Sequence, residues 1–376
     1  MKQEHERWMH RCLNLAAHGA GRVSPNPMVG AVLVDAEGTL LGEGWHREYG
    51  GPHAERHAVT EAEQRHGASA LQEATLYVNL EPCSHQGKTP PCTDFLLDKR
   101  IPRIVVGMVD PFPAVAGRGL ARLRDQGVAV TVGVLEKECR RFNEAFVHHV
   151  QTHRPLVTLK VAQTLDGRVA TRSGDARWIS GTASRRLVHR WRSQLDAVLV
   201  GSGTARNDNP ALTVRDVEGR QPVRLVLDRT GSLPAHLTLF NDAFRHLTTA
   251  VVNETATPAY ADALLEAGGR VLRLSEVDGH LDLDALLLRL GQDGGRTGLP
   301  VQSVLVEAGP GLAGALFRQD LVDRYFLFIA PKIVGSGLPT LCDLGVERMA
   351  EALTFADGSW ETIEGDVLFR GYRRAV

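Results

Sequence analysis

Alternating strand-like and helix-like segments, in two separate series, constrain the fold of this chain more than any other feature of its sequence. In residues 1–150, short runs that are apolar throughout or at every second position predict strands, and segments with apolar residues three and four apart predict helices. This alternation predicts a sheet covered by helices. The predicted strands are 29–34, 39–46, 74–80, 103–109 and 128–134, and the helical patterns fall near 54–66, 93–99, 117–126 and 136–149.

The stretch "QTHRP" separates the two series. Its proline, Pro155, disfavours continuation of the preceding helix, so we place a domain boundary there. The sequence therefore predicts an α/β protein of two domains, residues 1–150 and 151–376, as a length of 376 residues also favours. The strands predicted after the boundary are 156–162, 196–202, 222–228, 248–253, 270–274, 302–308 and 324–330, with a late antiparallel strand at 366–374.

Composition limits the partners and the compartment. A formal net charge of −1 argues against a general surface for nucleic acid, and no apolar run is long enough to span a bilayer. The N-terminus predicts an amphipathic helix and lacks the apolar core of a secretory signal. Five cysteines at irregular spacing are atypical of a disulfide framework. We expect a cytoplasmic protein with reduced thiols, in which Cys12, Cys139 and Cys342 are ordinary buried or half-buried residues.

Two short motifs in the first domain point to a metal site. His53 and Glu55 belong to "GPHAERHA", and Cys83 and Cys92 belong to "EPCSHQGKTPPC". One imidazole and two thiolates form a zinc set with a fourth position left for water, and Glu55 is placed to move a proton. Zinc nucleobase deaminases have the same order of residues, although two residues separate their cysteines and eight separate these.

Other interpretations of these motifs remain open at this point. A structural zinc site usually closes with a fourth protein ligand, which His57 or His85 could supply. The three residues could also be unconnected.

A glycine motif in the second domain suggests a phosphate site. Gly309, Gly311 and Gly314 follow a predicted strand and open a predicted helix, whose first backbone amides favour an anion. A Rossmann fold is not supported, because the motif is not on the first strand-helix unit and residues 324–342 contain no acidic ribose ligand. Tight helix packing is the competing explanation for these glycines.

The first half resembles the pyrimidine deaminase domain of the bifunctional deaminase/reductase family of riboflavin biosynthesis. The segments "PNPMVGAVLV", "GEGWHREYGGPHAE" and "DPFPAVAGRGLARL", together with "TPPC" before the second cysteine, carry the resemblance. It implies a cytidine-deaminase-like α/β/α sandwich with one zinc ion per chain. The implied ligands are His53, Cys83 and Cys92, the implied proton shuttle is Glu55, and the implied substrate contacts are Asn26, His46 and Lys88.

The second half resembles the reductase domain of the same family. The segments "LKVAQTLDGRVAT", "RWISG", "LDAVLVGSGTARNDNPALTVR" and "VEAGPGLAGAL" carry this resemblance, which implies a dihydrofolate-reductase-like α/β fold and NADPH as cofactor. The implied NADPH contacts are Ala162, Trp178, Thr204, Asp208, Gly309, Pro310, Gly311, Leu312, Ala313, Gly314 and Ala315. The implied substrate contacts are Lys160, Ala176, Arg192, Leu212, Arg215 and Glu307, of which the arginines suit a ribose phosphate.

Some of these positions carry alternatives. Lys160 could assist protonation or bind phosphate, and Trp178 and Trp191 could both be core residues. The chain has "NDNP" where the family more usually has "ADDP", so Asn209 replaces a second acid while Asp208 is kept.

The expected function is therefore a bifunctional riboflavin-pathway enzyme. Its first domain would deaminate a phosphoribosylaminopyrimidine, and its second would reduce the ribosyl group to ribityl with NADPH. The alternatives are a nucleic-acid base deaminase with an RNA-binding second half, and a non-catalytic scaffold stabilised by zinc. We expect small-molecule partners, no nucleic acid, no membrane, and a homo-oligomer.

Overall fold

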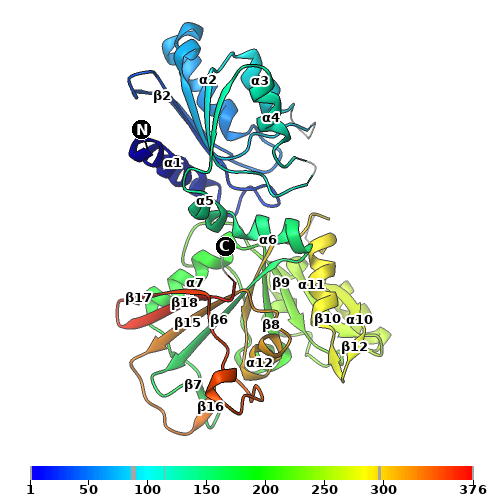
Figure 1. The fold of residues 1–376 in the computed structure, drawn as a ribbon. Coiled ribbons are helices and arrows are strands. Elements are labelled where there is room, and N and C mark those ends of the chain that lie inside the picture. Colours follow the sequence, from blue (N-terminus) through cyan, green and yellow to red (C-terminus); the bar gives the residue numbers. More distant parts are fainter. Residues whose placement is uncertain (1, 86–89, 114, 295–297, 375–376) are drawn as a thin grey trace. The chain divides into compact units, whose positions relative to one another are not determined.

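The computed structural model describes residues 2–85, 90–113, 115–294 and 298–374, and it divides the chain between Thr152 and His153 into two compact units (Figure 1). Within the described residues, no helix is both long enough and apolar enough to cross a membrane.

The first unit is built on a mixed sheet in the order β2-β1-β3-β4-β5. Strand β1 is antiparallel to β2 and β3, whereas β3, β4 and β5 run parallel. Its strands are β1 (Gly30–Val34), β2 (Leu40–Trp45), β3 (Thr75–Leu80), β4 (Arg103–Met108) and β5 (Ala129–Val132).

Helices cover both faces of this sheet, because the side chains of its buried strands alternate between two apolar cores. On one face, Leu33, Leu76 and Ile104 pack against α2, α3 and α4. On the other, Val32, Tyr77 and Val105 pack against α1, α5 and α6. These helices are α1 (Lys2–Ala16), α2 (Ala54–His66), α3 (Cys92–Asp98), α4 (Arg118–Asp125), α5 (Glu136–Phe142) and α6 (Glu144–Thr152).

The single helix predicted near 136–149 is wrong, because the chain breaks it at Asn143. This buried amide accepts a hydrogen bond from the Met28 backbone N–H at 2.8 Å and donates to the Met28 carbonyl at 3.0 Å. The Asn143 side chain therefore links the residues before β1 to the end of α5.

The second unit contains a longer sheet in the order β11-β10-β9-β8-β14-β6-β15-β18-β17. The strands from β11 to β15 are parallel, and β18 and β17 are antiparallel additions, as predicted for the late strand. The strands are β6 (Leu156–Thr164), β8 (Ala197–Gly201), β9 (Val223–Leu227), β10 (Thr248–Asn253), β11 (Arg270–Leu274), β14 (Ser303–Glu307), β15 (Arg324–Ala330), β17 (Asp357–Ile363) and β18 (Asp366–Tyr372).

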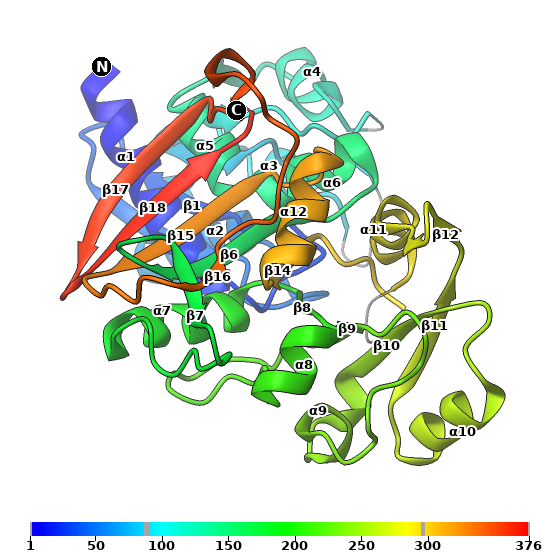
Figure 2. The same ribbon diagram turned by 90° about the horizontal axis from the view of Figure 1, so that it is seen from below.

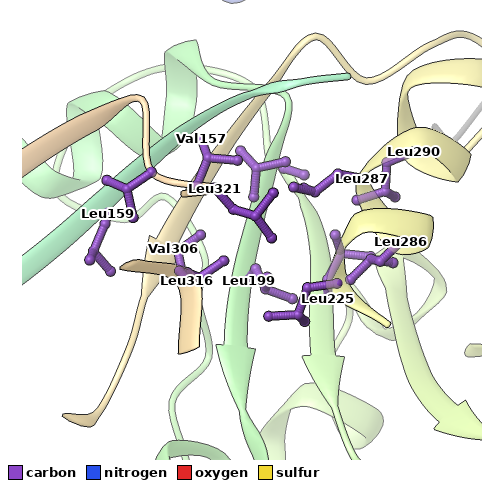
Figure 3. Close-up of a cluster of buried hydrophobic side chains, with 14 of the residues drawn as sticks. Val157, Leu159, Leu199, Leu225, Leu286, Leu287, Leu290, Val306, Leu316 and Leu321 are labelled. Atoms are coloured by element: carbon purple, nitrogen blue, oxygen red, sulfur yellow. The ribbon is translucent and has the colours of Figure 1, made fainter. Parts of the chain in front are cut away.

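Helices cover both faces of this sheet as well. Figure 2 shows α7 (Thr182–Gln194), α8 (Ser202–Asp208), α9 (Thr238–Asn241) and α10 (Pro258–Glu266) on one side, with α11 (Leu283–Gln292) and α12 (Pro310–Arg318) on the other. Leu199, Leu225 and Val306 point from the strands into the core beneath α11 and α12 (Figure 3). Burial of each such side chain contributes about 1.5–3 kcal/mol.

Short elements complete the structure. Two small antiparallel pairs lie outside the main sheets: β7 (Arg168–Thr171) with β16 (Gly337–Pro339), and β12 (Glu276–Val277) with β13 (His280–Leu281). Short 3₁₀ turns occur at Ala17–Gly19, Ala68–Glu73, Arg245–Leu247 and Met349–Glu351.

Candidate functional site

Three potential zinc ligands come together in the first unit. His53 immediately precedes α2, Cys83 follows β3, and Cys92 is the first residue of α3. The His53 Nδ1 lies 3.5 Å from the Cys83 Sγ and 3.3 Å from the Cys92 Sγ, and all three ligand atoms lie within 4.8 Å of one another. The fold thus brings together residues that the sequence separates by 30 and 39 positions.

The chemistry of this cluster fits a zinc ion. Hydrogen bonding to Cys92 lowers the pKa of the Cys83 thiol, with burial opposing and His53 adding to the effect, and the same contact raises the pKa of Cys92. One thiolate is therefore favoured before any metal binds, and thiolate is a ligand that zinc prefers. In the described part of the chain, the cluster does not include His57 or His85, so a closed structural site is not supported.

Glu55 lies in the first turn of α2 beside this cluster. Its side chain is buried, and its Oε2 has no hydrogen-bond partner among the described residues. Burial raises the pKa of Glu55, while the positive potential of His53 opposes the shift. A buried carboxylate oxygen without a partner is costly, so it indicates a polar ligand at this position.

Two of the three predicted substrate residues of this unit form a hydrogen-bonded pair. The Asn26 Nδ2 donates to the His46 Nε2 at 3.0 Å, and the His46 Nδ1 donates to the Pro52 carbonyl at 3.1 Å. Burial lowers the pKa of His46, which favours the neutral ring that this pattern requires. Lys88 lies outside the described residues.

Asn26, His46, His53 and Glu55 line one cavity of about 300 Å³. The same cavity includes Asp110, a residue outside the predicted site. Burial raises the pKa of Asp110 to about 6, with its hydrogen bond from Phe112 opposing. The position of Asp110 in the sequence could have indicated that it belongs to the site. Asp110 follows β4 as Cys83 follows β3, and parallel strands end at one edge of a sheet.

The second unit has a larger cavity, of about 1770 Å³, at the carboxyl ends of its parallel strands. Gly201 at the end of β8, Leu227 at the end of β9 and Glu307 at the end of β14 all line it. After β8 the chain continues to β9, which lies on one side of β8 in the sheet. After β14 it continues to β15, which lies in the opposite direction. The direction of the connections therefore reverses between the neighbouring strands β8 and β14. Open α/β sheets bind ligands at such a reversal.

The three glycines of the predicted phosphate turn differ in their surroundings. A Cβ on Gly309 would lie 3.6 Å from the Thr204 Oγ1 of α8, and a Cβ on Gly311 would meet nothing within 4 Å. A Cβ on Gly314 would lie 2.0 Å from the Cys342 Sγ. Among the described residues, Gly311 therefore leaves open space at the start of α12, Gly309 would make only an ordinary contact with Thr204, and Gly314 serves helix packing.

The remaining predicted residues of the second unit lie around this cavity, with two exceptions. Ala313 and Gly314 are turned into the core and do not line it. The lining residues that match the predictions are Lys160, Ala162, Ala176, Trp178, Arg192, Thr204, Asp208, Leu212, Arg215, Glu307, Gly309, Pro310, Gly311, Leu312 and Ala315.

Arg192 and Glu307 form an ion pair in the wall of the cavity. The Arg192 Nε and Nη2 donate to the two Glu307 oxygens at 2.6 and 2.9 Å. Burial alone would raise the pKa of Glu307, but Arg192, with help from Lys160, lowers it to about 2. Burial also lowers the pKa of Lys160, against the opposing charge of Glu307. The Arg192 guanidinium is thus already engaged by a carboxylate.

Trp178 and Trp191 have different environments. Trp178 is 62% exposed beside the cavity, and the Arg185 guanidinium carbon lies 4.6 Å from the centre of its ring. Trp191 is buried against Phe326 and Phe328. Trp191 is therefore a core residue, whereas Trp178 is available to a ligand.

Loop 209–215, the first part of the connection between α8 and β9, is held from several sides. Asn209 adopts a left-handed conformation, with φ of 41°, that asparagine tolerates, and its Oδ1 accepts from the Thr238 N–H at 2.8 Å. Arg192 donates to the Thr213 carbonyl at 3.1 Å, and the buried Arg224 donates to the Ala211 carbonyl at 2.8 Å. The amide that replaces the usual acid therefore has a structural contact of its own.

Comparison with known proteins covers nearly the whole chain. Residues 2–108 match the cytidine and deoxycytidylate deaminase zinc-binding region, and residues 155–369 match the RibD C-terminal domain. The riboflavin biosynthesis protein RibD of Escherichia coli is 39% identical over 93% of this chain and 94% of its own length. The protein of the same name from Synechocystis is 38% identical over 97% and 95%, respectively.

Solved structures agree with these matches. One crystal form of RibD from Acinetobacter baumannii superposes with a TM-score of 0.87 at 33% identity, covering 99% of both chains. A diaminohydroxyphosphoribosylaminopyrimidine deaminase/5-amino-6-(5-phosphoribosylamino)uracil reductase from Thermotoga maritima gives 0.83 at 36% identity, again over 99% of both chains. The predicted fold class is confirmed. The chain belongs to the RibD family, and it is a bifunctional enzyme of riboflavin biosynthesis that combines a zinc-binding deaminase with a reductase that uses a nicotinamide cofactor.

Proposed function

We propose that the first unit hydrolytically deaminates 2,5-diamino-6-(5-phosphoribosylamino)pyrimidin-4(3H)-one with one zinc ion per chain. The observation that carries this proposal is the buried Glu55 oxygen, which has no partner among the described residues, next to the cluster of His53, Cys83 and Cys92. The named activity of the Thermotoga relative supports the choice of substrate.

The residues of this unit divide the work of the reaction. Zinc, when bound by the histidine and the two cysteines, supplies a Lewis acid that makes water acidic enough to react near neutral pH. Glu55 accepts the proton of the attacking water and delivers it to the departing amine. Asn26, oriented by His46, binds the polar edge of the pyrimidine, and Lys88 binds the phosphate.

The second unit then reduces the ribosyl group of 5-amino-6-(5-phosphoribosylamino)uracil to ribityl. NADPH supplies the hydride for this step. The start of α12, with Gly309 and Gly311, binds a cofactor phosphate, since backbone N–H groups point out of a helix N-terminus. Lys160 contacts the ribose, and Arg215 binds the substrate phosphate, while Glu307 keeps Arg192 in place beside them.

A product analysis tests both halves together. The full chain is incubated with the diaminopyrimidine substrate, with and without NADPH, and the products are identified by mass. Without NADPH we expect the deaminated uracil only, and with NADPH the species that carries two more hydrogen atoms. Recovery of unchanged substrate from zinc-loaded protein would contradict the deaminase assignment, and a uracil that NADPH leaves unchanged would contradict the reductase assignment.

We also propose that the enzyme is a homo-oligomer that acts on small molecules. Strand β17 supports the proposed homo-oligomer, because it is the edge strand of its sheet and its Trp360 is 65% exposed. A net charge of −1 and the match of the second unit to a reductase speak against an RNA-binding half. Light scattering on the purified chain measures the assembly state, and a monomeric mass at micromolar concentration would contradict this proposal.

A further inference from the structure

The arginines that line the cavity of the second unit differ in what holds them. Among the described contacts, Arg177, Arg185, Arg192 and Arg318 each donate to at least one backbone carbonyl. The guanidinium groups of Arg215 and Arg229 each donate through one nitrogen to a side chain alone, Thr213 and Glu276 respectively. These two guanidinium groups therefore retain donors for a ligand and are held by side chains that can move.

Arg229 is placed to reach one end of a ligand bound at the start of α12. It closely follows β9, and β8 separates β9 from β14, the strand that leads into α12. At the usual strand spacing of about 4.8 Å, the ends of β9 and β14 lie about 10 Å apart. Arg215 belongs to loop 209–215, which Arg192 binds at Thr213 and Arg224 of β9 binds at Ala211. Both arginines line the same cavity.

The contact that Arg229 makes now is weak. Its Nη1 lies 3.4 Å from the Glu276 Oε1, at the limit of a hydrogen bond, and its side chain is 48% exposed. The same Glu276 oxygen accepts a much shorter bond, of 2.7 Å, from the Asn253 Nδ2. Glu276 therefore has a better partner than Arg229, and an anion that enters the cavity can take over the guanidinium.

A nicotinamide dinucleotide presents such an anion at its adenosine end only when the ribose carries a 2′-phosphate. An arginine near that ribose accommodates the phosphate in NADP-dependent enzymes, because its planar fork matches phosphate oxygens. We propose that Arg229 binds the 2′-phosphate of NADPH and so selects NADPH over NADH. This inference rests on the proposed reductase function and adds a specificity-determining residue to it.

The test measures binding, with Arg206 as the matched control. Arg206 lies on α8, donates to the Ser232 Oγ and does not line the cavity. Dissociation constants for NADPH, NADH and adenosine 2′,5′-bisphosphate are measured by calorimetry on the full chain, its Arg229→Ala variant and its Arg206→Ala variant. Arg229→Ala should weaken NADPH and the bisphosphate by roughly 10- to 100-fold, since a bond to a charged group is lost, and leave NADH unchanged. Arg206→Ala should change none of them.

Further measurements separate a failure of this inference from a failure of the proposed function. Because Arg229 is about half exposed, its replacement should not alter the melting temperature, and Arg229→Lys should keep part of the NADPH preference. An Arg229→Ala variant with the wild-type ratio of NADPH to NADH affinity overturns the inference but leaves the reductase assignment intact. A wild-type chain that binds NADPH and NADH with equal affinity would likewise overturn the inference and leave the reductase assignment intact. A wild-type chain that binds neither nucleotide removes the proposed function as well.

Discussion

Replacing Gly311 with aspartate tests whether the start of α12 binds a cofactor phosphate. A Cβ at this position meets no atom of the described residues within 4 Å, so the fold has room for the new side chain. The carboxylate would also lie in the first turn of α12, where a negative charge stabilises a helix by about 0.3–1 kcal/mol. The free energy of unfolding should therefore stay the same or rise slightly.

Cofactor binding should respond in the opposite direction. If a phosphate sits at this helix start, the new carboxylate lies roughly 5 Å from it, and at an effective dielectric constant of about 20 the repulsion is about 3 kcal/mol per pair of charges. That corresponds to a dissociation constant for NADPH raised on the order of 100-fold. Fluorescence titration of NADPH and thermal melting on the same sample measure both effects.

Gly314→Ala is the matched control in the same motif. Its Cβ would lie 2.0 Å from the Cys342 Sγ, and such overpacking costs about 1–3 kcal/mol. The melting temperature of the second unit should then fall by roughly 2–10 °C, with no selective loss of NADPH affinity. Normal NADPH affinity in a folded Gly311→Asp variant would refute the phosphate site at α12.

The remaining predictions concern both units. Cys92→Ser should lose zinc and deamination, because a hydroxyl replaces a soft thiolate ligand, while reduction of supplied uracil substrate continues; metal analysis and both assays check this. Glu55→Gln should retain zinc and the fold but stop deamination, and loss of zinc from this variant would instead make Glu55 a ligand. A chain that begins near residue 152 should still bind NADPH, and a soluble fragment that does not would contradict an independent second domain. The pKa of Glu307 is depressed to about 2, so its contribution to stability is complete above the unfolded value of about 4.3 and is lost as pH falls toward 2. The difference in melting temperature between the wild type and Glu307→Gln should therefore be constant from about pH 8 to pH 5 and shrink below about pH 4, and a change near neutral pH would contradict the assignment.

The sequence was sufficient for features that depend on local pattern or on the identity of a few reactive residues. Buried strands are short apolar runs, so their positions were predicted to within a few residues, including the antiparallel β18. The cluster of His53, Cys83 and Cys92 was predictable because a zinc site restricts the residue types and their order along the chain.

Features that depend on contacts between distant residues were not predictable in this way. Arg192 and Glu307 were selected separately as substrate contacts, and nothing in either segment shows that they are bound to each other across 115 positions. The three glycines of α12 look alike in sequence, but only the position of Cys342 distinguishes Gly314 from the others. The break at Asn143 likewise depends on Met28, which lies in another part of the chain.

The contacts that hold loop 209–215 have a consequence for the thermodynamics of ligand binding. Fixing the backbone of a flexible residue costs about 1–2 kcal/mol of conformational entropy, and a loop that became ordered only around its ligand would subtract this from the affinity. Here Asn209, Ala211 and Thr213 are already held by α9, β9 and α7. The entropic cost is met when the chain folds, so a ligand at Arg215 meets a surface that is already rigid. Arg224 holds the Ala211 carbonyl but does not line the cavity. If Arg224 is lost, the loop has to become ordered when the ligand binds. The affinity should then fall although no contact to the ligand is removed.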